Sequence, residues 1–362
     1  MFRLTVLLLL AALAPAALAQ GVIENVDVFK QEGRYGGWPA NIGIWTWGDE
    51  IVVGYIEGTF QIKEKGHAID NTRPRTPRLA RSLDGGKTWA QEMPSFLNGQ
   101  LEEAEPQVLD KAIDFSHPDF AMLFRYVDSG SGFSSFYASH DRCKNWDGPY
   151  ALPTFDRKAV AARTDYVVIG PHDIIAPITV VKENGREGRV LLSRTRDGGM
   201  TWNFVSWVTE EPAGFSIMPS TVRFDDGRLL TALRRKEGNE FWIEAWSSSD
   251  EGKTWTFVSR PAESTGGRNG NPGSMIRLRD GRLAITYGYR AEPFGIRARI
   301  SGDGGATWGR EIILRDDGGV YDLGYPRMTQ RADGKLVSIY YFNDAADKER
   351  YIAATIWDPG EK

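Results

Sequence analysis

The sequence has a single cysteine, Cys143, and only four histidines among its 362 residues. One cysteine cannot form an internal disulfide, so the stability of the fold must come from packing. No two histidines have metal-ligand spacing, and no cysteine cluster accompanies them, so we expect neither a zinc site nor a cofactor.

The sequence also lacks a strong net charge and has only one long apolar run. The net charge of −4 argues against nucleic acid as the main partner. The apolar run, Leu4–Leu13, follows Arg3 and precedes Ala17-Leu18-Ala19, which is typical of a cleavage site. We therefore expect residues 1–19 to be a signal peptide and the mature chain to be periplasmic or extracellular, without a membrane span.

An eight-residue pattern, Ser/Thr-x-Asp-x-Gly-x-Thr-Trp, is the strongest feature of the sequence. The copies recur at a nearly constant spacing of 53–57 residues between their tryptophans, and a period of this size indicates a repeat architecture. The Asp and Gly predict a hairpin turn, and the Trp predicts an apolar contact between repeats. Four full copies end at Trp89, Trp202, Trp255 and Trp308, and a worn copy ends at Trp146.

A second turn precedes an apolar, β-rich run in each repeat, and it occurs six times. The six turns are Gly48-Asp49, Pro118-Asp119, His172-Asp173, Asp226-Gly227, Asp280-Gly281 and Asp333-Gly334. Six inner turns and five outer ones predict an all-β, six-bladed β-propeller with four-stranded antiparallel blades and Asp-box hairpins. Residues 20–362 would form this single domain, and a strand from Val22–Phe29 would close the last blade.

An X-Pro pair stands ahead of five inner turns. We expect each pair to give an extended start to an innermost strand, so that the X residues ring one mouth of the central channel. The pairs are Trp38-Pro39, Glu105-Pro106, Met218-Pro219, Asn271-Pro272 and Tyr325-Pro326, and Thr164-Asp165 occupies the comparable place in the third repeat. The alternative is that each proline only sets the start of a strand.

The Asp boxes and their spacing resemble those of the sialidase superfamily over nearly the whole mature chain. The resemblance implies a Tyr nucleophile eight residues before the last inner-turn Asp, which is Tyr325 here. It implies an arginine eight residues after the fourth inner-turn Asp, which is Arg234, and a catalytic Asp in a loop ahead of the first box, which is Asp70.

Three positions depart from the sialidase pattern. Met218 stands where the family has the glutamate that activates the Tyr. Gly37-Trp38-Pro39 stands where the family has Arg-Ile-Pro with its first arginine, and Arg34 is nearby. Phe294 occupies the place of the third arginine, between Arg290 and Arg297. An arginine trio binds the carboxylate of sialic acid, and only one of the three arginines, Arg234, is in register here. A different acidic sugar or a neutral sugar is therefore also a candidate substrate.

These positions give a predicted site. We assign Tyr325 as nucleophile, Asp70 as the residue that protonates the leaving group or guides water, and Glu105 as the base for the Tyr, because Tyr needs activation to attack. His67, in the same loop as Asp70, is a further candidate acid or base. The predicted substrate-binding residues are Arg234, Arg290, Arg297, Arg34, Trp38, His67, Asp165, Met218 and Asn271.

The preferred hypothesis is an exported, exo-acting glycoside hydrolase of sialidase type that releases a terminal, acidic sugar from a glycan by a retaining mechanism. Two alternatives are open. One is a lyase on uronate-containing polysaccharide, with Tyr325 or His67 removing a proton. The other is a sugar-binding propeller without catalysis.

Overall fold

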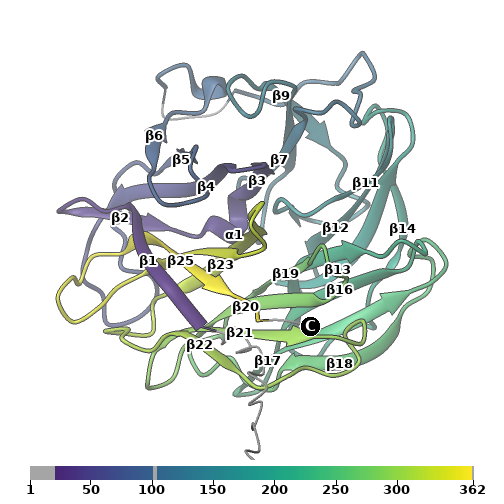
Figure 1. Cartoon of the computed structure of the whole chain (residues 1–362). Coiled ribbons are helices and arrows are strands. Elements are labelled where there is room, and N and C mark those ends of the chain that lie inside the picture. The colour runs from purple at the N-terminus through teal and green to yellow at the C-terminus, as the bar shows by residue number, and fades with distance from the viewer. Residues whose placement is uncertain (1–20, 101–103, 361–362) are drawn as a thin grey trace, which may run out of the picture.

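The computed structural model describes residues 21–100 and 104–360, so the predicted signal peptide, residues 1–19, lies outside the described residues. Within this part the chain is a six-bladed β-propeller, as the sequence predicted (Figure 1). No helix among the described residues is long and apolar enough to cross a membrane. The two helical segments are short: α1 (Pro39–Ile42) and the 3-10 turn Ser95–Leu97.

Each blade is an antiparallel sheet formed by consecutive strands. Blade 1 contains β2 (Arg34–Gly37), β3 (Gly43–Trp47), β4 (Glu50–Thr59), β5 (Thr76–Ser82) and β6 (Ala90–Glu92). Blade 2 contains β7 (Ala121–Tyr126), β8 (Ser134–Ser139) and β9 (Asp147–Leu152). Blade 3 contains β10 (Val160–Ala161), β11 (Val167–Gly170), β12 (Asp173–Val181), β13 (Glu187–Thr195) and β14 (Asn203–Trp207).

The last three blades each have four strands. Blade 4 contains β15 (Phe215–Arg223), β16 (Leu229–Glu237), β17 (Glu240–Ser248) and β18 (Thr256–Ala262). Blade 5 contains β19 (Gly273–Arg277), β20 (Leu283–Tyr289), β21 (Gly295–Ser301) and β22 (Ile312–Arg315). Blade 6 contains β23 (Gly324–Gln330), β24 (Leu336–Phe342), β25 (Tyr351–Asp358) and β1 (Gly21–Phe29).

The N-terminal strand closes the ring, as predicted. β1 pairs antiparallel with β25 from Gly21↔Asp358 to Phe29↔Ile352, so the first described residues form the outer strand of the last blade. In Figure 1 the purple β1 lies beside the yellow β25. Joining the two ends in one sheet covers the edge that β25 would otherwise expose.

Blade 2 differs from the four-stranded pattern. Among the described residues it has three strands, and β7 pairs with β8 alone. The segment that precedes β7 does not enter the blade centre: Gln107 bonds through its backbone to Pro149 and Ala151 at the outer strand β9. The sequence pattern around Glu105-Pro106 therefore did not produce an innermost strand.

The Asp boxes form the outer hairpins. In the first box, Asp84 accepts hydrogen bonds from the backbone N–H of Lys87 (3.0 Å) and of Thr88 (2.9 Å), and Ser82 Oγ accepts one from Gly86 N (2.8 Å). Gly85 and Gly86 have left-handed φ (74° and 90°), which a residue without Cβ adopts without strain. The worn copy has Arg142 (φ 60°) and Cys143 (φ 67°) in these places.

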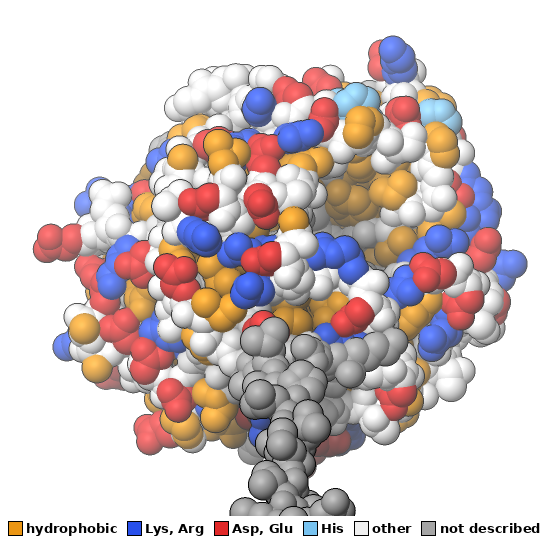
Figure 2. All heavy atoms as spheres, viewed as in Figure 1, with side chains coloured by type: hydrophobic (Ala, Val, Ile, Leu, Met, Phe, Trp, Pro, Cys, Tyr) orange, Lys and Arg blue, Asp and Glu red, His pale blue; other side chains and the backbone are white. Residues whose placement is uncertain are grey.

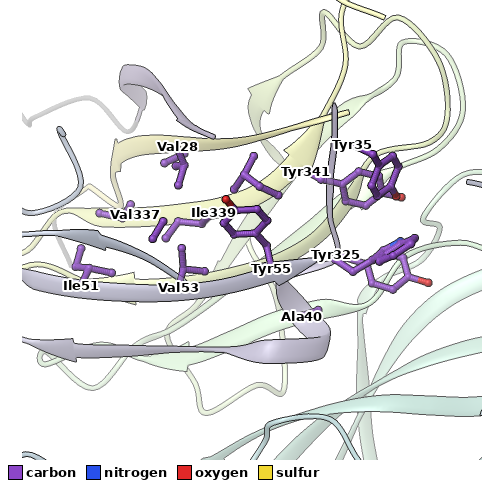
Figure 3. Close-up of a cluster of buried hydrophobic side chains, with 14 of the residues drawn as sticks. Val28, Tyr35, Ala40, Ile51, Val53, Tyr55, Tyr325, Val337, Ile339 and Tyr341 are labelled. Carbon is purple, nitrogen blue, oxygen red and sulfur yellow. The ribbon is translucent and has the colours of Figure 1, made fainter. Parts of the chain in front are cut away.

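The hydrophobic core is distributed between neighbouring blades. Figure 3 shows the cluster between blades 1 and 6, where Val53 of β4 faces Val337 and Ile339 of β24. Tyr325 lies at one end of this cluster, with its hydroxyl pointing away from the aliphatic side chains. Figure 2 shows acidic and basic side chains mixed over the surface, and a hollow lined by hydrophobic side chains in the face seen there.

Candidate functional site

Three X-Pro pairs have a left-handed first residue, which corrects the prediction of an extended start: Trp38 begins α1, and the other two pairs form bulges. Trp38 (φ 56°), Met218 (φ 54°) and Tyr325 (φ 48°) all have left-handed backbone conformations. The strand registers shift at two of them, between Ile217 and Ser220 and between Gly324 and Arg327. A bulge re-aims the bulged side chain, and a left-handed conformation in a non-glycine residue is a strained one that functional sites often retain.

Tyr325 is held at its backbone and at its hydroxyl. Asn271 Oδ1 accepts a hydrogen bond from Tyr325 N (2.8 Å), while Asn271 Nδ2 donates to Leu323 O (2.8 Å). Arg234 Nη1 donates to Tyr325 Oη (3.0 Å) and also contacts Met218 Sδ (3.3 Å). Asn271 and Met218 therefore fix the tyrosine rather than extend toward a ligand.

Three arginines surround the ring of Tyr325. The guanidinium groups of Arg234 and Arg290 lie 5.5 Å and 5.4 Å from its centroid, and the charge of Arg163 also acts on it. Burial raises the pKa of the Tyr325 phenol, but these three cations outweigh burial and hold the pKa below its usual value. Tyr325 is thus more readily ionised than a free tyrosine, as a nucleophile or base requires.

His67 and Asp322 form a hydrogen-bonded pair. His67 Nδ1 lies 2.7 Å from Asp322 Oδ1, and Asp322 is 1% exposed. Burial raises the pKa of the Asp322 carboxyl, but His67, Arg350 and Arg290 hold it below its usual value, so the carboxylate is ionised and accepts the Nδ1 proton. The other ring nitrogen, Nε2, is then the one that can exchange a proton with a substrate.

Further contacts join the His67 pair to Tyr325. Tyr341 Oη donates to Asp322 (2.8 Å) and accepts from Arg290 Nη2 (2.8 Å). The rings of His67 and Tyr325 are 6.1 Å apart in an edge-to-face arrangement. Trp38 packs on the other side of His67, with ring centroids 4.9 Å apart. The imidazole and the phenol therefore border the same space.

That space is a cavity of about 290 Å³, which we call the central cavity. Its walls come from α1, from the loop that carries His67, and from blades 2, 3 and 6. The described lining residues include no Asp or Glu. They are Trp38, Asn41, Lys63, Lys65, Gly66, His67, Ile69, Asn71, Arg75, Tyr126, Arg163 and Tyr325.

Two residues predicted to act as acid and base are not among those that line the central cavity. Asp70 caps its own loop: its Oδ1 accepts from Thr72 N (2.9 Å) and Thr72 Oγ1 (2.7 Å), and these bonds lower the pKa of the carboxyl. A proton donor needs the opposite shift. Glu105 is exposed and is followed by Gln107 at the outer strand of blade 2, because the expected inner strand is missing.

Three predicted binding residues also lie away from the cavity, each with a protein partner. Arg34 pairs with Glu57 (2.6 Å), and Arg297 lies 3.3 Å from a carboxylate oxygen of Glu311. Asp165 accepts from Thr221 Oγ1 (2.8 Å), and burial raises the pKa of its carboxyl to about 6. These side chains stabilise blades 1 and 5 and the contact between blades 3 and 4.

The sequence reasoning missed Arg163 and Asp322. Arg163 directly precedes Thr164-Asp165, the third repeat's substitute for an X-Pro pair, and that position could have pointed to it. Asp322 has no such signal, since it stands three residues before Tyr325 and outside every repeated motif. Among the described residues, no group of three or more His, Cys, Asp or Glu side chains could hold a metal ion.

Comparisons with known proteins agree with this fold. Residues 160–338 match the model of the BNR repeat-like domain. No curated protein matches the chain in sequence. A protein of unknown function from Dyadobacter fermentans is similar in structure, with a TM-score of 0.74 and 22% identity, over 94% of this chain and 99% of that one.

Two glycosidases of known structure share the fold at lower identity. The sialidase of Trypanosoma rangeli has a TM-score of 0.60 and 13% identity, over 92% of this chain and 59% of the sialidase. The α-L-arabinofuranosidase of Fusarium graminearum, of family GH93, has a TM-score of 0.61 and 13% identity, over 92% of this chain and 97% of that one. At these identities the likeness concerns the fold.

Proposed function

The chain belongs to the sialidase-like β-propellers, and on that premise we propose that it is an exported exo-glycosidase that releases a terminal acidic sugar from glycans. The observation that carries the proposal is the charge of the central cavity. Its described walls carry lysines and arginines and no carboxylate. A cavity lined by one sign of charge concentrates a ligand of the opposite sign.

The positions of Tyr325 and His67 support a retaining mechanism. Tyr325 Oη, ionised under the influence of the arginines, would attack the anomeric carbon while the glycosidic C–O bond breaks. Protonated His67 would give its Nε2 proton to the departing oxygen. Water would then attack the anomeric carbon and break its bond to Tyr325. His67 would take a proton from that water, and Tyr325 would leave as phenolate.

This assignment replaces Asp70 by His67 as the acid. Asp322 holds the imidazole through Nδ1, in the way that a buried carboxylate orients a catalytic histidine in other enzymes. The positive surroundings lower the pKa of Tyr325, so the arginines supply part of the activation that a neighbouring base would give. The presence of Met218 in place of the expected glutamate is consistent with this scheme.

A lyase reaction on a uronate is the second candidate. The observation in its favour is the His–Asp pair together with the absence of a carboxyl group from the described walls of the central cavity. His67 Nε2 would remove the proton next to the uronate carboxylate, the bond to the leaving oxygen would break, and a C=C bond would form. The leaving oxygen would take a proton from water. The basic side chains would neutralise the developing charge.

Product analysis separates the two candidates. We expect the purified enzyme to release a reducing monosaccharide from one member of a panel of glycans capped with sialic, glucuronic or galacturonic acid. An unsaturated product that absorbs in the ultraviolet would instead establish the lyase. Binding without any product, from fully folded protein, would overturn both reactions.

A further inference from the structure

A second cavity lies next to the central one. It has a volume of about 240 Å³ and shares Trp38, Asn41, Arg75 and Tyr126 with the central cavity. From there it extends between blade 1 and blade 2, past Arg125. We call this second cavity the notch. The two cavities are therefore neighbours that share one boundary.

Blade 2 has no innermost strand among the described residues, and blade 3 covers the free edge of β7 instead. Tyr166 Oη accepts from Met122 N (3.2 Å), and Thr164 Oγ1 accepts from Phe124 N (3.0 Å). These backbone N–H groups therefore have partners without that strand. The notch is lined by the end of β7, at Arg125 and Tyr126.

The boundary between the two cavities is rigid. Arg163 Nε donates to Asn41 Oδ1 (3.0 Å), Asn41 Nδ2 lies 3.4 Å from Tyr126 Oη, and the Arg163 guanidinium lies 4.8 Å from the Tyr126 ring. Arg163 is itself anchored by Glu187 (2.5 Å). The amide and the phenol are thus fixed where two neighbouring sugar units would meet.

The notch presents the chemistry of an acidic sugar site. Trp38 and Tyr126 offer aromatic surface, which suits the apolar face of a sugar ring. Arg75 offers a guanidinium group, which matches a carboxylate in planar, two-bond geometry. Arg75 is exposed, and no carboxylate among the described residues forms an ion pair with it.

We propose that the notch binds the sugar unit next to the one that is released, and that this second unit carries a carboxylate. The inference rests on the proposed function, because it places the first unit in the central cavity. It makes the substrate an acidic oligosaccharide or polysaccharide with charged units in succession. A terminal acidic sugar on a neutral chain would leave the notch without its ionic contacts.

Binding of short uronates tests the notch separately from the central cavity. The probes are the mono- and disaccharides of glucuronic acid and of galacturonic acid, measured by calorimetry on the Tyr325→Phe protein so that no turnover occurs. We expect one disaccharide to bind about tenfold more tightly than its monosaccharide. Arg75→Ala should abolish this gain, which is measured as the ratio of disaccharide to monosaccharide affinity because Arg75 lines both cavities.

Arg73→Ala is the matched control, since Arg73 belongs to the same loop, is exposed, and lines neither cavity. It should retain the disaccharide gain. Equal affinity for mono- and disaccharide, or a gain that survives Arg75→Ala, overturns the notch and leaves the proposed function intact. If no monosaccharide or disaccharide binds, the notch is overturned, and glucuronic and galacturonic acid are excluded as the sugar held in the central cavity.

Discussion

At the scale of single residues, Tyr325 is defined by what surrounds it. Its strained backbone is held by Asn271, and its phenol by Arg234. The X-Pro pattern made Tyr325 a candidate pocket residue, and Tyr325 lines the central cavity, although by a bulge and not by the expected extended start. It could not predict the three cations around the ring, because Arg163, Arg234 and Arg290 come from three different blades and meet only in the closed propeller.

The arginines give a prediction for pH dependence. Replacing Arg234 by Gln removes one of the charges that lower the pKa of Tyr325, so that pKa rises. If ionised Tyr325 attacks, activity falls as pH drops through this pKa, and the acidic limb of the kcat/KM profile should move to higher pH in Arg234→Gln. An unchanged acidic limb, with kcat/KM lowered equally at every pH, would show that Arg234 acts only in binding.

His67 and Asp322 should affect catalysis differently from stability. His67→Gln removes the proton-transfer group from the cavity wall, and we expect kcat to fall by about 10²–10⁴-fold with little change in melting temperature. Asp322→Asn also leaves the buried Arg350 without its charged partner (3.0 Å), which should lower the free energy of unfolding by about 3 kcal/mol. Thermal melts alongside turnover measurements distinguish the two effects, and a His67→Gln enzyme with normal kcat would remove His67 from the mechanism.

At the scale of the element, the Asp-box hairpin was predictable because its interactions are local. Ser, Asp, Gly and Thr bond to one another within eight residues, so the sequence alone specifies the turn. The conformation of the X-Pro bulges was not predictable in this way. A residue before proline favours extended backbone in isolation, and only the packing of the blades imposes the left-handed φ at Met218 and Tyr325.

The hairpins should contribute to stability and not to chemistry. Trp308 is half-buried and donates to Ser259 Oγ of the preceding blade (3.1 Å), so Trp308→Ala should cost about 2–3 kcal/mol, at or below the range for a fully buried aromatic. Asp84→Ala should also lower stability through lost turn bonds. Both folded variants should keep wild-type kcat at low temperature. A Trp308→Ala protein with unchanged melting but no activity would contradict this assignment.

The aspartates of the Asp boxes make the stability of the fold depend on pH under acidic conditions. Hydrogen bonds from the turn hold the pKa of Asp84, Asp250 and Asp303 at about 2, below that of an unfolded chain. Their contribution to stability is complete above about pH 4, the unfolded pKa, and is lost as pH falls toward 2. The denaturant midpoint should therefore decline over that window.

At the scale of the whole molecule, the ring closes through β1, and blade 2 has no innermost strand among the described residues. The closure could be predicted, because the sixth repeat lacks an outer box and the N-terminal segment supplies a spare strand. The absence of an innermost strand from blade 2 could not be predicted, since Glu105-Pro106 repeats the pattern of the other blades. Only the course of the chain at Gln107, along β9, shows that the inner strand is absent.

Deleting residues 20–29 tests the closure. Loss of β1 would expose the edge of β25, where Ile352, Ala354 and Ile356 are now buried. We expect a lower melting temperature and a tendency to aggregate through the exposed edge. A deletion variant that melts like the full chain and stays monomeric would show that the other blades maintain the ring without this strand.

The central claim is that Tyr325 forms a bond to the sugar in a cavity built for an anion. The most direct measurement is the intact mass of the protein after reaction with a fluorinated glycosyl fluoride of the released acidic sugar, followed by peptide mapping. We predict one added glycosyl group, on the peptide that contains Tyr325, and none in Tyr325→Phe. An active enzyme that gains no mass, or gains it on another residue, would contradict the account.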